Sequence, residues 1–182
     1  MRQLRDIAAT AATFIVLIPV MTGCSGGEDK AIPSIPARIC WDVFASRDLT
    51  HFLPTGEKAT VSSRPFVLVE DLDSTTCSLD IDGRTQFQAT AKYEDFERGI
   101  DWTSYEKADP DPMDAGEKGI IWYNGAASYI ICEPSKTPST PGKYIDLRLN
   151  TFAPPEDEKP RKALPAMMRQ FVAFAQRKLN CK

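Results

Sequence analysis

The five cysteines of this 182-residue chain are the residues whose positions point most directly to chemistry. Cys24 follows the small residues Thr22 and Gly23, and the chain before them has a positive start and an apolar stretch over residues 7–21. These features are typical of a secretory signal. The stretch is short for a membrane-spanning helix, which needs roughly 20 apolar residues. The pattern predicts an exported protein.

The segment Met21-Thr22-Gly23-Cys24 resembles the lipobox of bacterial lipoproteins, although Leu is commoner where Met21 stands. The resemblance implies a lipoprotein signal peptide at 1–23, cleavage before Cys24, and a diacylglycerol on the Cys24 sulfur. Two acyl chains suffice for stable anchoring. We expect a chain held by lipid on the extracytoplasmic face of the cell membrane. An ordinary signal peptide or an uncleaved anchor is the alternative.

Four cysteines remain once Cys24 is assigned to lipid, and an even set in an oxidising compartment predicts two disulfides. They are Cys40, Cys77, Cys132 and Cys181. Three connectivities are open, and we favour the near neighbours, Cys40 with Cys77 and Cys132 with Cys181. Each bond would contribute about 4 kcal/mol in the chain-entropy treatment. A zinc site is the alternative, but no Cys-x-x-Cys spacing supports it.

Histidine-dependent catalysis would have to use His51, the only histidine in the chain. A Ser-His-Asp or Cys-His site needs partners for that imidazole, and only Asp48 lies in register with it. The sequence contains no Gly-rich phosphate loop, HExxH or GxSxG motif. We therefore expect His51 to be an ordinary helix residue, the protein not to be an enzyme, and no cofactor to be bound.

An acidic segment over residues 94–118 holds the remaining candidate site residues. Asp109, Asp111 and Asp114 could gather around a calcium ion, but the order of an EF-hand and its glycine are missing. A solvated acidic loop without metal is expected there. Trp102 and Tyr105 could form a sugar- or peptide-binding rim, with ordinary packing under a long loop as the alternative.

The charge of the chain limits its partners. It has 22 Lys and Arg against 25 Asp and Glu, and removing residues 1–23 leaves 20 against 24, about −4. Nucleic-acid binding usually shows a basic patch or stripe, so we expect no nucleic-acid partner. An acidic total likewise gives no reason to expect electrostatic docking on anionic lipid.

These residues must be positioned by one domain behind a flexible tether. Residues 24–37 are rich in Gly, Ser, Pro and charge, which cannot build a core. Apolar residues at helical spacing predict helices over Cys40–Leu53 and Leu164–Leu179. Alternating or short apolar runs predict strands in the following places: Phe66–Val69, Cys77–Ile81, Thr85–Tyr93, Gly119–Tyr123, Ala126–Cys132 and Tyr144–Phe152.

Turn residues and element order then fix the fold class. Asp82-Gly83 and Asn124-Gly125 predict hairpins, and residues 57–63 and most of 94–118 are read as loop. Residues 38–182 are expected to form a single disulfide-braced α+β domain. It would have an antiparallel sheet of five or six strands, with an N-terminal and a C-terminal helix packed on one face.

The layout resembles small actinobacterial envelope lipoproteins built on a domain of unknown function. The resemblance rests on the lipobox and on four segments: Ile39-Cys40-Trp41, Cys77-Ser78-Leu79, Gly119-Ile120-Ile121-Trp122 and Leu179-Asn180-Cys181. It implies a single-membrane envelope with the anchor in the outer leaflet, and brings no catalytic residues.

Two functions follow as expectations. The first is a non-catalytic binding or interaction module of the envelope, with an envelope protein or a wall ligand as partner. The alternative is a carboxylate-dependent hydrolase acting on envelope glycans. The hydrolase would need two carboxylates facing each other at roughly 5–10 Å.

Overall fold

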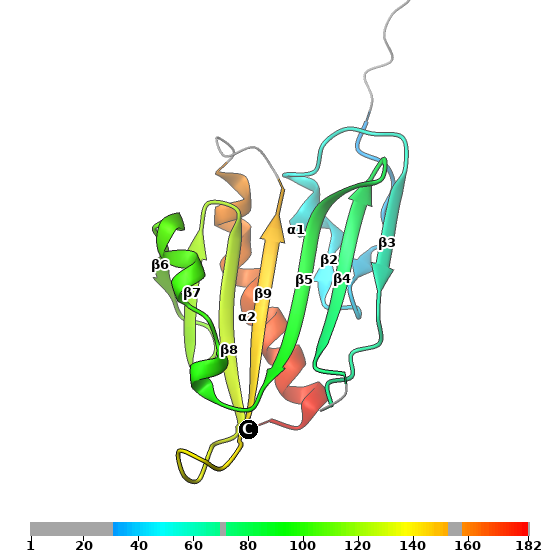
Figure 1. Cartoon of the computed structure of the whole chain (residues 1–182). Coiled ribbons are helices and arrows are strands. Elements are labelled where there is room, and N and C mark those ends of the chain that lie inside the picture. The colour runs from blue at the N-terminus through cyan, green and yellow to red at the C-terminus, as the bar shows by residue number, and fades with distance from the viewer. Residues whose placement is uncertain (1–30, 70–71, 153–157, 182) are drawn as a thin grey trace, which may run out of the picture.

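A computed structural model describes residues 31–69, 72–152 and 158–181. Its main element is a seven-stranded antiparallel sheet with the order β3-β4-β5-β9-β8-β7-β6 (Figure 1). The strands are β3 (Ala59–Ser63), β4 (Ser74–Ile81), β5 (Arg84–Glu94), β6 (Asp111–Met113), β7 (Lys118–Trp122), β8 (Gly125–Glu133) and β9 (Lys143–Thr151). The class is therefore α+β with an antiparallel sheet, as the sequence predicts.

Period-two alternation directs the side chains of the central strands. In β9, Ile145, Leu147 and Leu149 are fully buried on one side of the sheet, because successive residues of a strand point to opposite faces. Phe87, Ala89 and Ala91 of β5 and Cys77, Leu79 and Ile81 of β4 face the same way, as the cross-strand register requires. This side carries the main core.

Helix α2 (Lys159–Leu179) covers that core side, packing over β8, β9 and β7. It starts earlier than the predicted Leu164. Pro160 is compatible with this start, because the first turn of a helix does not use the backbone N–H that proline lacks. Arg177 and Lys178 occupy the last turn, where cations suit the helix dipole. Phe171 on its buried face has no exposed surface.

The predicted N-terminal helix over Cys40–Leu53 is wrong. A two-stranded hairpin of β1 (Arg38–Ile39) and β2 (Phe44–Ala45) stands there, followed by the short helix α1 (Ser46–Thr50). Cys40, Trp41 and Asp42 have φ of 52°, 60° and 60°, a left-handed conformation that costs about 1–2 kcal/mol per residue. The apolar residues of this stretch are still buried on the core side.

Tertiary contacts hold this left-handed turn in place. Cys40 forms a disulfide with Cys77, and the Trp41 ring lies 5.0 Å from the ring of Phe66 and 5.8 Å from that of Phe171. The Trp41 Nε1–H donates to the carbonyl of Arg64 at 2.7 Å. Together these contacts stabilise a left-handed backbone that the turn residues would not adopt on their own.

Three further predictions, two of loop and one of a strand, are wrong. Residues 59–63, read as loop, form the edge strand β3, and Asp111–Met113 of the acidic segment pairs with β7 as β6. Phe66–Val69 is not a strand, because its backbone forms only an isolated bridge between Val69 and Leu72. Edge strands bury little surface, so hydrophobic periodicity marks them weakly.

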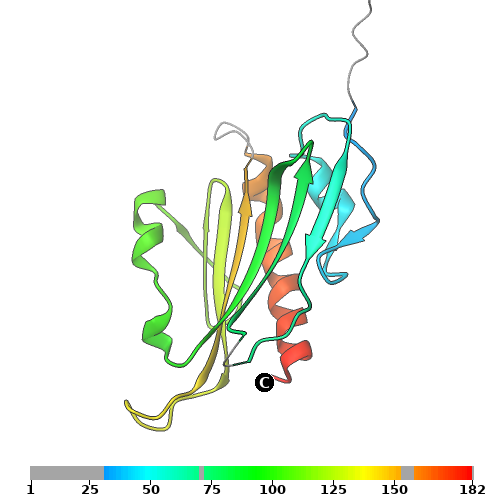
Figure 2. The same ribbon diagram turned by 45° about the vertical axis from the view of Figure 1, so that its right-hand side comes forward.

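The opposite side of the sheet is covered over only part of its width. Two 3-10 helices, η1 (Glu97–Gly99) and η2 (Thr103–Ala108), lie on that side over β7 and β8, while α2 and the β1–β2 hairpin lie on the other side (Figures 1 and 2). Trp102, Tyr105 and Ala108 pack there against Ile120, Trp122 and Ala127. None of the described helices covers the face of β4, β5 and much of β9 on this side (Figures 1 and 2).

Candidate functional site

The open part of the sheet, which we call the polar sheet face, carries side chains that form hydrogen bonds. Register places Ser78, Gln88 and Asn150 in one cross-strand row and Thr76, Thr90 and Arg148 in the next. The hydroxyls of Thr76 and Thr90 are 3.4 Å apart. All of these residues are half-buried, the usual exposure for side chains on an uncovered sheet.

A charge pair on β9 lies where the covered and open parts of this side meet. The Nε–H of Arg148 donates to Oδ2 of Asp146 at 2.8 Å, and Nη2 of Arg148 forms an ion pair with the same oxygen at 2.5 Å. Asp146 is 1% exposed, and its other oxygen, Oδ1, is buried with no hydrogen-bond partner among the described residues. An unsatisfied buried acceptor is rare and asks for an explanation.

Tyr105 of η2 closes one side of this pair. Its ring stacks on Trp122 at 4.7 Å between centroids, and the guanidinium of Arg148 lies 5.4 Å from the ring centre. The Tyr105 hydroxyl is also buried without a hydrogen-bond partner in the described part of the chain. Two orphaned polar atoms thus lie close to one guanidinium.

Burial shifts the proton affinities of this group. Burial raises the pKa of Asp146, against the hydrogen bond from Arg148 that lowers it. For Arg148, burial alone would lower the pKa, but the bond to Asp146 outweighs it and the net direction is upward. Burial also raises the pKa of Tyr105 to about 12. The shifts of Asp146 and Tyr105 therefore have the same cause, their burial at this corner of the sheet, whereas the upward shift of Arg148 comes from its bond to Asp146.

A second ion pair continues the charged row toward the end of β5. Lys92 Nζ donates to Glu94 Oε1 at 2.7 Å, and this bond is the largest reason that the pKa of Lys92 is raised. Lys92 is the direct cross-strand neighbour of Asp146. Glu94 and Asp146 also repel each other, which raises the pKa of Asp146 further. Cations and carboxylates therefore alternate along this edge.

The structure places the aromatic candidates in packing positions. Tyr105 has Trp122 and Arg148 against its ring, and Trp102 has Lys118 Nζ 4.5 Å from its ring centre and Tyr129 at 6.0 Å. Both residues are half-buried. They form the wall of the polar sheet face and not a freely stacking platform.

The other candidates lie apart from the polar sheet face. Asp111 binds Arg161 of α2, and Asp109 ends η2 in a left-handed conformation. Within the described ranges no three His, Cys, Asp or Glu side chains are placed to hold a metal ion, Asp109, Asp111 and Asp114 included. His51 is exposed just after α1.

The cysteines fall into two groups. Cys40 is joined to Cys77 and Cys132 to Cys181, the two near-neighbour pairs that the sequence favoured. The first disulfide ties the β1–β2 hairpin to β4, and the second ties the end of α2 to β8. Cys24 lies outside the described residues.

Sequence reasoning missed Asp146 and Arg148. Their signal is present in the alternation of β9, where Ile145, Leu147 and Leu149 mark one face and Asp146 and Arg148 fall on the other. Alternation alone predicts that such charges are solvated. Only the tertiary structure shows that the carboxylate is buried beside Arg148, whose guanidinium lies over the ring of Tyr105 of η2.

Comparison with protein-family models, with curated proteins and with solved structures finds no match for this chain. Among the described residues, no helix combines the length and apolar character needed to cross a membrane.

Proposed function

We propose that this chain is an exported lipoprotein, anchored through Cys24, whose domain is a non-catalytic binding module of the cell envelope. We assign ligand binding to the polar sheet face. The observation that carries this proposal is an open, contiguous polar surface on β4, β5 and β9 that includes the partly exposed Arg148, which the buried Asp146 holds in place. Polar residues that converge beside an apolar wall are typical of binding sites.

The chemistry of the face favours a hydroxyl-rich ligand. Gln88 and Asn150 present amides, and Thr76, Thr90 and Ser78 present hydroxyls, so donors and acceptors alternate over a few ångströms. Sugar hydroxyls also donate and accept at the same atom. An envelope glycan is therefore the ligand class that we propose.

The cost of the Asp146–Arg148 pair supports a functional role. A buried ion pair is often no more stable than an apolar pair of the same size, so the fold alone gives little reason for this one. Arg148 keeps about a third of its side chain exposed, at 34%, while Asp146 is covered. A ligand on the polar sheet face would meet Arg148 held rigid from below.

The test uses the purified full chain and insoluble cell-wall glycan. Thr90→Arg places a long cation in the middle of the polar sheet face and should reduce co-sedimentation with the glycan at least tenfold, about 1.4 kcal/mol. Thr137→Arg, in the exposed β8–β9 loop, makes the same change elsewhere and should bind normally. Equal binding by both variants would refute the assignment.

A carboxylate-dependent hydrolase is the second candidate, and one observation favours it. Asp146 has a raised pKa, while Glu94 on the same side is paired with Lys92, and two carboxylates in such different environments are how acid and base roles are divided. Binding is better supported because both Asp146 oxygens are inaccessible: Arg148 holds one and the other is buried.

The same glycan preparation separates the two candidates. We expect no new reducing ends during incubation with the full chain. Release of reducing ends by the natural chain, abolished by Asp146→Asn and by Glu94→Gln separately, would establish the hydrolase instead. Retained binding by the Asp146→Asn chain shows that the variant is folded.

A further inference from the structure

The charge of this protein is divided unevenly between its two layers. Helix α2 contains six Lys and Arg residues and no Asp or Glu. Because the whole chain has a net charge of −3, the chain without this helix would carry −9 (−3 minus 6). The chain therefore contains a strongly basic helix although its net charge is negative.

The cations of α2 are gathered on its solvent side. Lys159, Lys162, Arg169 and Arg177 recur at helical spacing opposite the buried stripe, and all four are exposed. The positions between them hold Ala166, Gln170 and Ala173. We call these seven residues the basic helix face. The two alanines and the uncharged Gln170 between the long cations allow a flat surface to approach the whole length of the helix, about 31 Å for 21 residues.

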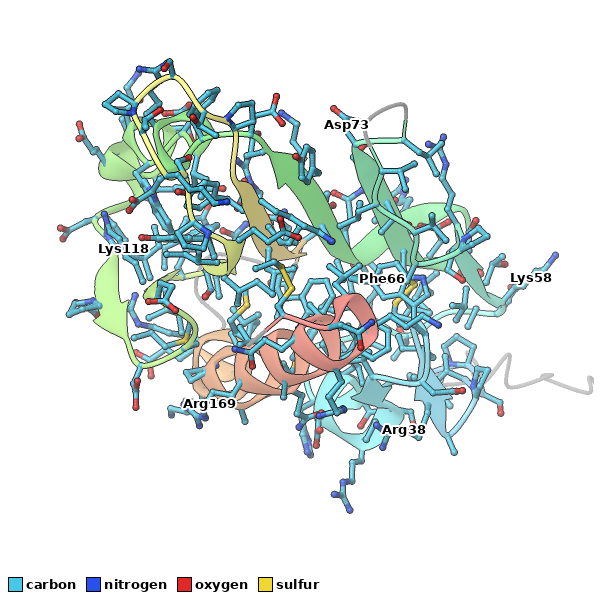
Figure 3. All side chains as sticks on the ribbon, turned by 90° about the horizontal axis from the view of Figure 1, so that it is seen from below. Arg38, Lys58, Phe66, Asp73, Lys118 and Arg169 are labelled. Atoms are coloured by element: carbon cyan, nitrogen blue, oxygen red, sulfur yellow. A yellow bond between two sulfur atoms is a disulfide. The ribbon has the colours of Figure 1, made fainter. Side chains whose placement is uncertain are left out.

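Neighbouring elements extend this face. A cavity of about 330 Å³ lies between the β1–β2 hairpin, α1 and the second half of α2. Its lining includes Arg38, Arg47 and Arg177 together with Asp42 and Asp48. Two N–H groups of Arg38 donate to the backbone carbonyls of Asp42 and Val43. Figure 3 shows Arg38 and Arg169 on the helix side of the sheet.

Among the described residues, few acidic groups lie beside these cations. Asp42 and Asp48 lie in the cavity, and Glu158 pairs with Lys162 at 3.6 Å, where both side chains are more than three-quarters exposed. Such exposed pairs contribute little. Arg161 is turned to the flank of the helix, where it binds Asp111. The net charge of the face is positive.

We infer that the basic helix face docks on an anionic phospholipid surface and orients the domain on the membrane. The inference rests on the proposed function, because the anchor at Cys24 brings the domain to that surface. Clusters of Lys and Arg beside a membrane anchor are attracted to anionic head groups.

The short stretch of chain between Cys24 and the domain favours lipid over other anionic partners. Ala31, the first described residue, comes seven residues before β1 and seven after Cys24, so each span is at most about 25 Å. The β1–β2 hairpin lies in the same layer as α2. An anchor at Cys24 can therefore lie level with the basic helix face.

Docking in this orientation has a consequence for the ligand site. The polar sheet face lies on the other side of the sheet from α2 (Figure 1). A domain resting on α2 would turn the polar sheet face away from the membrane, toward the wall. The basic helix face would then contact lipid while the polar sheet face contacts glycan.

Lysine footprinting on vesicles tests the inference. The full chain is added to preformed vesicles of phosphatidylcholine alone or mixed with phosphatidylglycerol, and lysines are acetylated and identified by mass spectrometry. On the anionic vesicles, Lys159 and Lys162 of the basic helix face should react at least about threefold more slowly. Lys58 and Lys118, which Figure 3 shows away from α2, should react equally in both. High salt should remove the difference, because it screens exposed charges.

A matched pair of variants controls for charge alone. Arg169→Ser with Arg177→Ser removes two cations of the face and should weaken the protection, by roughly fivefold in membrane affinity per cation. Arg84→Ser with Lys136→Ser removes two exposed cations outside α2 and should leave it intact. Equal protection in the two double variants would overturn the docking.

Flotation separates the docking from the anchor. A chain that floats with phosphatidylcholine vesicles, but whose α2 lysines react equally on both vesicle types, is anchored and does not dock. A chain that does not float with phosphatidylcholine, yet shows salt-sensitive protection on anionic vesicles, docks without an anchor. The first result overturns the inference and the second overturns the proposed anchoring.

Discussion

At the scale of single residues, the tyrosine hydroxyls between η2 and the sheet decide how this corner of the molecule behaves. Tyr105 of η2 and Tyr129 of β8 both lie near the ring of Trp102, and the Tyr129 hydroxyl donates to the carboxylate of Glu97 at 2.5 Å. The hydroxyl of Tyr105 is buried without a hydrogen-bond partner in the described chain. The same substitution should therefore have opposite effects at these two positions.

We expect Tyr105→Phe to leave the unfolding free energy unchanged or raise it by about 1 kcal/mol, because it removes an unsatisfied buried hydroxyl. Tyr129→Phe should lower it by about 1.5–3 kcal/mol, because a hydrogen bond to a charged acceptor is lost. Urea denaturation at neutral pH measures both. A larger loss at Tyr105 than at Tyr129 would contradict this account of the site.

The pH dependence gives Tyr105 a second signature. Its pKa in the folded protein is about 12, above the ordinary 10.0, so the unfolded chain releases the proton first as pH rises. Stability is therefore fully present below about pH 10 and falls as pH rises toward 12. Tyr105→Phe should make the decline shallower, measured by denaturation between roughly pH 9 and 11.

At the scale of elements, one aromatic cluster joins the β1–β2 hairpin to α2. Phe171 of α2 lies 5.8 Å from Trp41, 5.7 Å from Phe44 and 6.2 Å from Phe66, measured between ring centres. The left-handed turn at Cys40–Asp42 depends on this packing, since its backbone is strained. Hairpin and helix should therefore lose order together.

Phe171→Ala should lower the unfolding free energy by about 3–5 kcal/mol, the usual cost of emptying a large buried aromatic site. Phe152→Ala is the matched control, because Phe152 is 53% exposed, and it should change stability by less than about 0.5 kcal/mol. Urea denaturation provides both values. A small effect at Phe171 would mean that the hairpin packs independently of α2.

At the scale of the whole molecule, the two disulfides fasten the helix layer to the sheet at two places. They close loops with sequence separations of 37 and 49 residues, and each is worth about 4 kcal/mol in the chain-entropy treatment. Together they match much of the 5–15 kcal/mol by which an ordinary domain is stable. The fold should depend on an oxidising environment.

Reduction of the purified chain should therefore shift the thermal midpoint downward by at least about 10 °C, followed by circular dichroism. Replacing Cys132 and Cys181 with Ser should give part of that shift, and replacing Cys40 and Cys77 should give more, because that bond also holds the strained turn. An unchanged midpoint after complete reduction would show that the core alone suffices.

The main strands and the C-terminal helix could be predicted from local pattern. Alternation over Thr85–Tyr93 and Tyr144–Phe152 and the apolar stripe of Leu164–Leu179 are long enough that burial on one face leaves a clear period. The short edge strands β3 and β6 have no such period. The stripe at Trp41 and Phe44 predicts one long helix wrongly, because a hairpin and a short helix bury the same residues as one long helix would.

The sequence by itself determined the even set of four cysteines, the α+β class and the closing amphipathic helix, because these depend on residue type and spacing along the chain. Only the tertiary structure decided that Asp146 is buried, that the Tyr105 hydroxyl is buried without a partner among the described residues, and that six cations of an acidic chain lie in one layer. Burial and charge separation depend on which segments pack together, here η2 over β7 and β8 and α2 behind the sheet. Long-range contacts of this kind leave no local period in the sequence.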